Sequence, residues 1–132
     1  MKDIYFRTNT TVCFINYHFV FCPKYRKKIF LNKNIEIKFK ELIKEICNML
    51  KIEIIAMECH IDHVHLFLKC WPQQSPSNIM KIIKGITSFK LRDEFVYLSG
   101  MKSLWTRSYF VSTAENVSSN TIKWYIDTQK TR

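Results

Sequence analysis

Residues 63–70, which read His-Val-His-Leu-Phe-Leu-Lys-Cys, restrict the possible folds more than any other part of the sequence. Histidine, phenylalanine and lysine alternate here with valine, leucine and cysteine, which is the period of a β-strand with one buried face. In such a strand His63 and His65 point to the same side, with Cα atoms roughly 6.5–7 Å apart. The run therefore predicts a strand that packs an aliphatic face on a core and presents two histidines on the other face.

Segments rich in β-branched and aromatic residues predict four strands in all. These strands cover residues 9–22, 51–59, 63–70 and 104–112. The short turn His60-Ile61-Asp62 joins the second strand to the third, so the two should form a hairpin. His60 could assist a site formed by the two histidines that follow it, but a surface role is the alternative that we favour.

Apolar residues at helical spacing predict two scaffold helices. The first covers residues 35–50, and its apolar positions are Ile35, Phe39, Leu42, Ile43, Ile46, Met49 and Leu50. The second follows Ser75-Pro76, a typical N-cap and first-turn pair. Its expected buried positions are Ile79, Ile82, Ile83, Ile86 and Phe89. A last helix, capped by Ser118 or Ser119, should run over about residues 118–130.

The order of these elements matches one known arrangement. Strand, helix, strand, strand, helix and strand form the ferredoxin-like βαββαβ unit, an α+β fold. We therefore expect a four-stranded antiparallel sheet with two helices on one face, plus the added C-terminal helix. With 132 residues, of which 47% are hydrophobic, the chain should form a single domain over residues 1–132.

The charge of the chain indicates a polyanionic partner. Lys and Arg number 21 and Asp and Glu 11, which gives a net charge of +10. Such a surplus on a small domain favours phosphate binding with counterion release, although a merely soluble basic surface is the alternative. Candidate contacts lie in a basic stretch around Tyr25, on the second helix beside Gly85, and in the fourth strand. They are Lys24, Arg26, Lys27, Lys28, Lys81, Lys84 and Arg107.

Two of these regions have another interpretation. The basic stretch at 24–28 suits phosphate contact and base stacking, and suits a solvated turn equally well. Gly85 could admit a nucleic-acid backbone or pack against a neighbouring strand. The five cysteines include no CxxC pair and should be small buried residues in a reducing compartment. No run of 18 apolar residues occurs, so we expect a cytoplasmic protein without a membrane partner.

Two histidines on one strand face can bind a metal ion and leave coordination positions open, as catalytic sites do. Tyr125 and Gln129 are four residues apart on the last helix and share a face, so the amide oxygen of Gln129 could join the ion. A nearby ion favours a phenolate, which predicts attack by tyrosine on a phosphodiester. The alternatives are hydrogen-bonded or exposed histidines, and a tyrosine buried in a core or dimer surface.

Four stretches of the sequence together resemble the single-tyrosine HUH transposases of the smallest bacterial and archaeal insertion sequences, relatives of the REP-associated tyrosine transposases. They are residues 16–26, 62–66, 104–112 and 123–129. The resemblance implies that His63 and His65 are metal ligands, that Gln129 is the third ligand and that Tyr125 is the nucleophile. It also implies Mg²⁺ or Mn²⁺ as the cofactor.

The same resemblance implies an activity and an assembly. Its members cleave single-stranded DNA to a 5′-phosphotyrosine and a free 3′-hydroxyl, transfer the strand, and recognise hairpins at the element ends. They are homodimers with joined sheets, and the tyrosine helix of one subunit commonly completes the histidine site of the other. The alternative is a non-catalytic ferredoxin-like module that binds nucleic acid, either an RNA binder or a decayed transposase.

Overall fold

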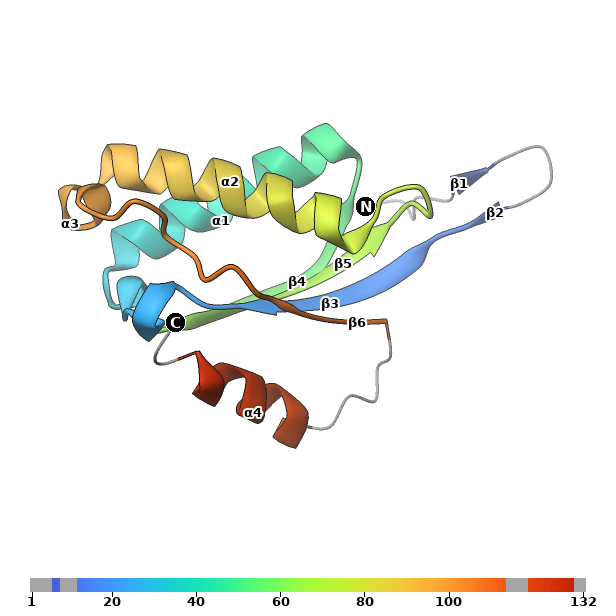
Figure 1. Ribbon diagram of the computed structural model, residues 1–132. Helices are drawn as coiled ribbons and strands as arrows, with labels where there is room; N and C mark the ends of the chain where they lie inside the picture. Colours follow the sequence, from blue (N-terminus) through green and yellow to red (C-terminus); the bar gives the residue numbers. More distant parts are fainter. Residues whose placement is uncertain (1–5, 8–11, 114–118, 130–132) are drawn as a thin grey trace.

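The computed structural model describes residues 6–7, 12–113 and 119–129. The predicted βαββαβ order is confirmed, and a further helix follows it (Figure 1). In chain order these elements are β3 (Ile15–Phe21), α1 (Lys33–Leu50), β4 (Glu53–His60), β5 (His63–Cys70), α2 (Pro76–Glu94), β6 (Phe110–Ser112) and α4 (Ser119–Thr128). Shorter elements are β1 (Phe6–Arg7), β2 (Val12–Cys13), the 3₁₀ turns Lys24–Arg26 and Ile29–Leu31, and α3 (Val96–Ser99).

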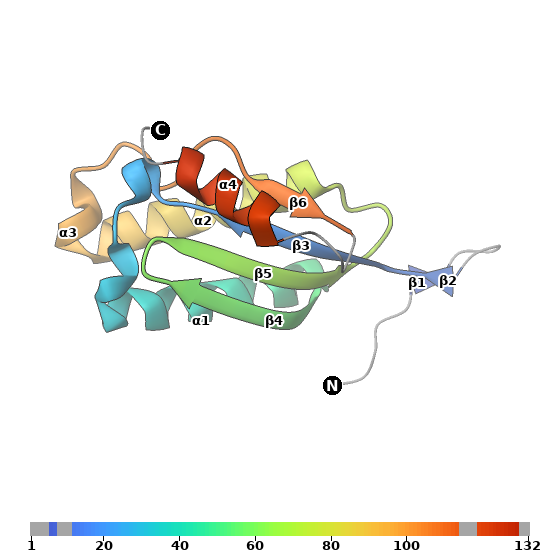
Figure 2. The ribbon, with the colours of Figure 1, turned by 90° about the horizontal axis from the view of Figure 1, so that it is seen from below.

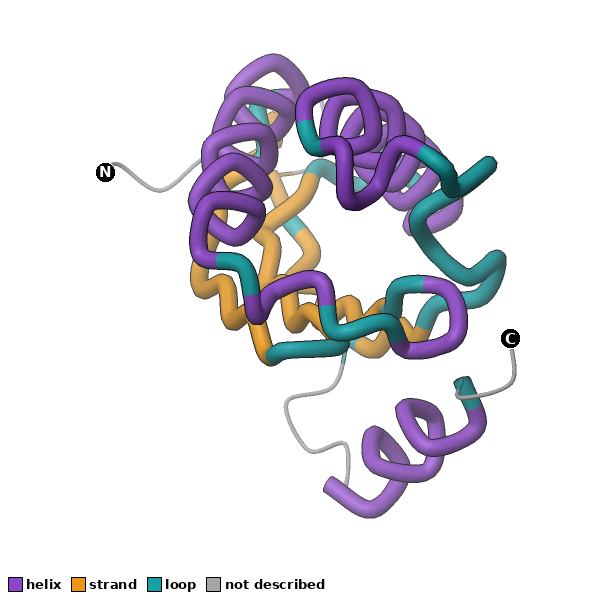
Figure 3. Tube along the Cα trace, turned by 90° about the vertical axis from the view of Figure 1, so that its left-hand side faces the viewer, coloured by secondary structure: helices purple, strands orange, loops and turns teal. Residues whose placement is uncertain are grey.

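The main sheet has the strand order β4-β5-β3-β6, and every neighbouring pair is antiparallel. Helices α1 and α2 cover one face of this sheet, and α4 lies on the other (Figures 1 and 3). Seen from the face that carries α4, the helix lies over β3 and β6, whereas β4 and β5 are uncovered (Figure 2). We call this second side the open face.

The alternation in residues 63–70 places the core as predicted. Val64, Leu66 and Leu68 are fully buried beneath α1 and α2, so His63 and His65 are directed to the open face. The Asn32 side chain caps α1, and Ser75 caps α2 as the sequence indicated. Among the helices in the described ranges, none has the length and apolarity needed to cross a bilayer.

The predicted strand over 9–22 is too long. Within its described part, β2 pairs with β1 in a separate two-stranded sheet, and only β3 belongs to the main sheet. In addition, two residues expected to be buried are exposed, namely Met49 and Phe89. Thr87 and Ser88 are buried on α2 in place of Phe89, because their hydroxyls bond to the indole of Trp105 and the backbone of Leu104.

The predicted strand over 104–112 is shortened to the three residues of β6. Before β6, the chain follows the end of β3 through backbone bonds from Lys24 to Leu104 and from Thr106 to Cys22. The next backbone carbonyls turn toward the Lys84 ammonium instead of a neighbouring strand. Arg107 is therefore an exposed loop residue and not part of a strand.

Candidate functional site

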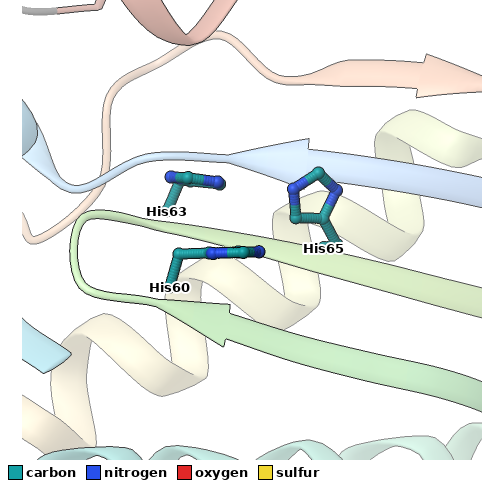
Figure 4. A group of neighbouring side chains, drawn as sticks. All are labelled: His60, His63 and His65. Atoms are coloured by element: carbon teal, nitrogen blue, oxygen red, sulfur yellow. The ribbon is translucent and has the colours of Figure 1, made fainter. Parts of the chain in front are cut away.

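The β4–β5 hairpin gathers three histidines on the open face. Its register places His60 opposite His63 and Glu58 opposite His65, and paired residues share a face of the sheet. The rings of His60 and His63 stack with centroids 4.4 Å apart, and His65 lies 5.2 and 5.1 Å from them. One ring nitrogen of each histidine lies within 4.8 Å of the others (Figure 4).

The two histidines of β5 are each held by a hydrogen bond through Nδ1. His63 Nδ1 donates to the Asp62 carboxylate at 2.8 Å, and His65 Nδ1 lies 3.0 Å from Nε2 of His18. Burial lowers the pKa of His63, and burial together with the neighbouring histidines lowers the pKa of His65 to about 4. Both imidazoles are thus neutral near pH 7, and both keep Nε2 for another partner.

These properties fit a divalent metal ion. Metal-bound histidines need a neutral ring, and they usually donate their second N–H to a carboxylate or another acceptor that orients the ring. Asp62 and His18 fill that role here. The residues able to hold an ion are therefore His63 and His65 through Nε2, with His60 beside them.

Arg26 joins the histidine hairpin to the tyrosine helix. Its Nε and Nη2 donate to Asp62 Oδ2 at 3.0 and 2.8 Å, and its Nη1 lies 3.4 Å from the Asp127 carboxylate on α4. Burial alone would raise the pKa of Asp62, but the hydrogen bonds from His63 and Arg26 hold it below its usual value. Asp62 therefore stays a carboxylate that orients His63.

The backbone before Arg26 adopts an unusual conformation to make this link. Tyr25 and Arg26 have φ of 59° and 49°, a left-handed region that costs other residues more than glycine. This bend directs Arg26 at Asp62, while the Tyr25 ring is 72% exposed. The predicted DNA contact Arg26 thus has two internal acidic partners, and Tyr25 is available for a ligand.

Tyr125 packs on the open face of its own chain's sheet. It is 7% exposed and forms a small cluster with Ile126, Val20, Cys22 and Phe110. Val20 is paired in register with His65, so the strand that contacts Tyr125 is the direct neighbour of the histidine strand. The side chains of residues 114–123, which include Ile122, lie outside those that the structure describes.

A chain of hydroxyl and amide groups surrounds the phenol. The Tyr125 hydroxyl lies 3.4 Å from Ser108 Oγ, and Ser108 Oγ donates to Gln129 Oε1 at 3.1 Å. Because the serine has a single proton, the tyrosine hydroxyl is the donor where it bonds to Ser108. Gln129 is only 3% exposed, and its amide nitrogen donates to Thr128 Oγ1.

Lys84 supports this arrangement from α2. Its ammonium donates to the carbonyl oxygens of Thr106, Arg107 and Ser108 at 2.6, 3.1 and 3.3 Å. Burial lowers the pKa of this lysine to about 8. Although we predicted a DNA contact here, the structure directs Lys84 at the loop that carries Ser108.

The other predicted DNA-binding residues lie on more than one surface. Lys28, Lys81 and Arg107 are exposed, and Lys24 is partly exposed beside Arg107 in a shallow hollow. The ammonium of Lys27 lies 4.5 Å from the ring centre of Tyr97. Because α2 covers the face of the sheet opposite α4, Lys81 is on the other side of the sheet from Tyr125 (Figure 1).

Sequence reasoning gives no role to three residues of this site, His18, Asp62 and Ser108. It allows His60 to assist the site but favours a surface role, and the structure places His60 in the histidine cluster with its side chain 51% exposed. For His60 a signal existed, since a two-residue turn between paired strands places the residue before it opposite His63. The other three bond to residues that are distant in the sequence or, for Asp62, to the residue after a turn. The periodicity of strands and helices does not predict such contacts.

Comparison with known proteins gives a consistent result. A family model described as "Transposase IS200 like" matches residues 11–129. The transposase for insertion sequence element IS200 of Salmonella typhimurium LT2 is 33% identical over 110 residues, which cover 81% of this chain and 70% of that protein. The ISDra2 transposase TnpA of Deinococcus radiodurans is 30% identical over 121 residues, covering 87% and 84%.

Two solved structures also resemble this chain. A crystal structure described as a transposase from Deinococcus radiodurans R1 matches with a TM-score of 0.86 and 26% identity, over 96% of this chain and 98% of that one. A REP-associated tyrosine transposase bound to a REP hairpin matches with a TM-score of 0.59 and 14% identity, over 98% and 68%. The second likeness concerns the fold alone.

Proposed function

The chain belongs to the IS200-like transposases, enzymes that cut and transfer DNA, and from this premise we propose that it cleaves and rejoins single-stranded DNA through a covalent bond to Tyr125. One observation carries the proposal. Tyr125 and Gln129 are buried on the open face, and Val20, which Tyr125 contacts, is the cross-strand partner of His65. The proposed nucleophile and the two proposed metal ligands thus belong to one helix and to the two adjacent strands beneath or beside it.

The proposed step is an exchange of phosphate esters. The phenolic oxygen of Tyr125 attacks a backbone phosphorus, the bond from phosphorus to the 3′ oxygen breaks, and the downstream DNA remains as a 5′-phosphotyrosine. The phenol loses its proton and the departing 3′ oxygen gains one, which gives a free 3′-hydroxyl. Ser108 Oγ accepts a hydrogen bond from the phenol before the step, and solvent water takes up the phenol proton and supplies the one gained by the 3′ oxygen. Attack by a 3′-hydroxyl of another strand end reverses the exchange and rejoins DNA.

His63 and His65 are the proposed ligands of a divalent ion, Mg²⁺ or Mn²⁺, with Gln129 as a further ligand. When bound, the ion supplies positive charge that polarises the phosphate and favours a phenolate over a phenol whose ordinary pKa is about 10. The residues of the chain prepare the site, since Asp62 and His18 orient the two rings and Arg26 holds α4 near them.

We propose that the substrate contains a DNA hairpin, as in the REP-associated transposase structure. The exposed cations Lys28, Lys81 and Arg107, with Lys24 and Lys27, supply phosphate contacts. Arg26 and Lys84 also belong to the proposed set of DNA contacts. Because both already bond to groups of the protein, they can contact phosphate only with the part of the side chain that these partners do not cover. The DNA substrate and the free thiols of all five cysteines are consistent with action in the cytoplasm.

We also propose a homodimer in which each active site combines His63 and His65 of one chain with Tyr125 of the other. Among the described residues, α4 contacts the rest of the chain through the cluster around Tyr125 and Ile126, through the bonds of Tyr125 and Gln129 to Ser108, and through the ion pair Arg26–Asp127. Because every copy of the chain carries the same residues, α4 of one chain can make these contacts with the sheet of a second copy.

Replacing Tyr125 by phenylalanine tests the chemistry. The assay incubates protein and Mn²⁺ with a single-stranded hairpin oligonucleotide labelled at its 3′ end, because the downstream fragment stays on the protein. Wild-type protein should give a labelled adduct on a denaturing gel, and Tyr125→Phe should give none while still shifting the hairpin on a native gel. Tyr97→Phe, at a 56% exposed tyrosine, is the matched control and should form the adduct.

An adduct from Tyr125→Phe would refute the assignment of the nucleophile. Hairpin binding by the wild-type protein without any cleavage, in Mg²⁺ and in Mn²⁺, would instead support a non-catalytic DNA-binding module.

Mixing two inactive variants tests the shared site. A His63→Ala/His65→Ala double variant and the Tyr125→Phe variant should each be inactive, but their heterodimer contains one complete site if the tyrosine acts on the partner's histidines. Adduct formation should then recover after subunit exchange, which differently tagged chains can verify. Absence of recovery after verified exchange would mean that each site is built within one chain.

A further inference from the structure

We propose that His60 is a third imidazole ligand of the metal ion, so that the β4–β5 hairpin supplies three nitrogen donors by itself. The inference rests on the proposed function for the presence of the ion, and it adds a ligand from outside the His63–His65 pair and the tyrosine helix. A third nitrogen ligand would also make the site more selective against Mg²⁺ than the His63–His65 pair alone.

The hairpin register carries the inference. His60 and His63 end and begin the two strands and face each other across a two-residue turn, so their side chains share the open face. Their rings are nearly parallel, at 10°, and the edges of both are directed toward His65, whose ring is inclined at about 70° to each (Figure 4). Three imidazole edges therefore converge on one region of the sheet.

The spacing is close to that of a bound ion. Three nitrogens held by one ion with bonds of about 2.0–2.2 Å lie roughly 3–3.5 Å apart. The nitrogens of this cluster lie within 4.8 Å of one another, so side-chain adjustments of about 1–2 Å bring them to the spacing of bound ligands. His60 can make that adjustment because its side chain is 51% exposed, whereas the other two rings are held by Asp62 and His18.

Apart from its stacking on His63, His60 has only a weak polar contact among the described residues. Among the described residues, its one charged partner is Glu58, whose carboxylate oxygen lies 3.7 Å from Nε2 and is largely exposed. An exposed pair of this kind contributes little to stability. A carboxylate at this position is nevertheless useful beside a metal ligand, because it can orient the ring or accept its second N–H.

A three-histidine site has a consequence for selectivity. Imidazole nitrogen suits Zn²⁺ and the other later transition metals, and Mn²⁺ accepts it more readily than Mg²⁺, which binds oxygen ligands and gives up water reluctantly. We therefore expect the protein without DNA to bind Mn²⁺ and Zn²⁺ measurably and Mg²⁺ far more weakly. Loss of His60 should reduce this difference, since it removes one of three nitrogen donors.

The experiment measures metal binding on the purified full chain without DNA. Free Mn²⁺, followed by its electron paramagnetic resonance signal, gives Kd for the wild type, His60→Ala and His60→Gln. Both variants should bind Mn²⁺ at least about tenfold more weakly, while hairpin binding in the absence of metal stays unchanged. Glu58→Gln is the matched control on the same strand and should change Kd less than the His60 variants. Circular dichroism melting shows that each variant is folded.

Equal Mn²⁺ affinity of wild type and both His60 variants would overturn the inference. Failure of the proposed function is a separate result, because an adduct from Tyr125→Phe would reject the tyrosine as nucleophile and leave the metal titration standing. Loss of Mn²⁺ binding in Gln129→Ala but not in His60→Ala would also overturn it, since the third ligand would then come from the tyrosine helix.

Discussion

The hydrogen bond between His18 and His65 should determine how tightly the site holds a metal ion. His18 lies on β3 with Nε2 3.0 Å from His65 Nδ1, and its ring stacks on Phe67 with centroids 4.1 Å apart at 11°. Replacing His18 by phenylalanine keeps an aromatic ring on Phe67 but removes the nitrogen that orients His65. The change therefore separates orientation from packing.

The expected magnitude follows from the contact that is lost. Removing a group that orients a metal-bound histidine typically lowers affinity by about 10- to 100-fold, which corresponds to about 1.4–2.7 kcal/mol. His65 is only partly buried, so we expect the cost of leaving its Nδ1 donor unsatisfied to be at the low end of about 1–3 kcal/mol. We expect weaker metal binding with a small change in thermal stability.

The assay is a titration of His18→Phe with Mn²⁺ by calorimetry, beside a thermal melt of the metal-free protein. Tyr17→Phe is the matched control, because it removes a hydroxyl from the next residue of β3, whose side chain packs against the main core instead of His65. Unchanged Mn²⁺ affinity in His18→Phe would refute the argument, since it would show that His65 is positioned without this bond.

Three further outcomes are expected. His63→Ala should abolish cleavage while hairpin binding persists, and parallel loss of both on nicking and gel-shift assays would contradict this. Lys28→Ala should flatten the slope of log affinity against log salt by about 0.7–0.9, and an unchanged slope would place the phosphate contact elsewhere. Lys84→Met should lower the free energy of unfolding by about 1–3 kcal/mol in chemical denaturation, whereas Lys81→Met, at an exposed lysine, should change it little. Equal effects of the two substitutions would show that the bonds from Lys84 to the backbone do not stabilise the fold.

Much of the fold could be predicted because its core follows simple periods. The alternation of β5 and the apolar stripe of α1 identified strands and helices before any contact was known, and the order of elements then left few topologies. Thr87 and Ser88 could not be recognised as buried, because the groups that satisfy their hydroxyls come from residues 104 and 105. For the same reason the strand over 104–112 was overestimated, since Lys84 takes up backbone carbonyls that a sheet would otherwise use.

The histidine site could be predicted only in part. His63 and His65 are two residues apart on one strand, so their common direction is a local property of the chain. The position of His60 depends on the register of the hairpin. The short turn makes the register with His60 opposite His63 the expected one, but the sequence alone does not determine it. The roles of Asp62 and His18, which hydrogen-bond the two rings, can be recognised only when the strands and the turn are assembled.

The position of the tyrosine helix is the part that the sequence could determine least, and the reason is energetic. Burying Tyr125 and Ile126 contributes about 1.5–3 kcal/mol each, and ordering α4 offsets much of this gain. The exposed Arg26–Asp127 contact adds little. The burial of these two side chains therefore contributes only a few kcal/mol to docking on the chain's own sheet, and an identical sheet in a second copy of the chain would offer the same contacts. In the proposed homodimer, the position that α4 occupies would depend on protein concentration and on the other contacts between the two chains, neither of which is a local property of residues 119–129.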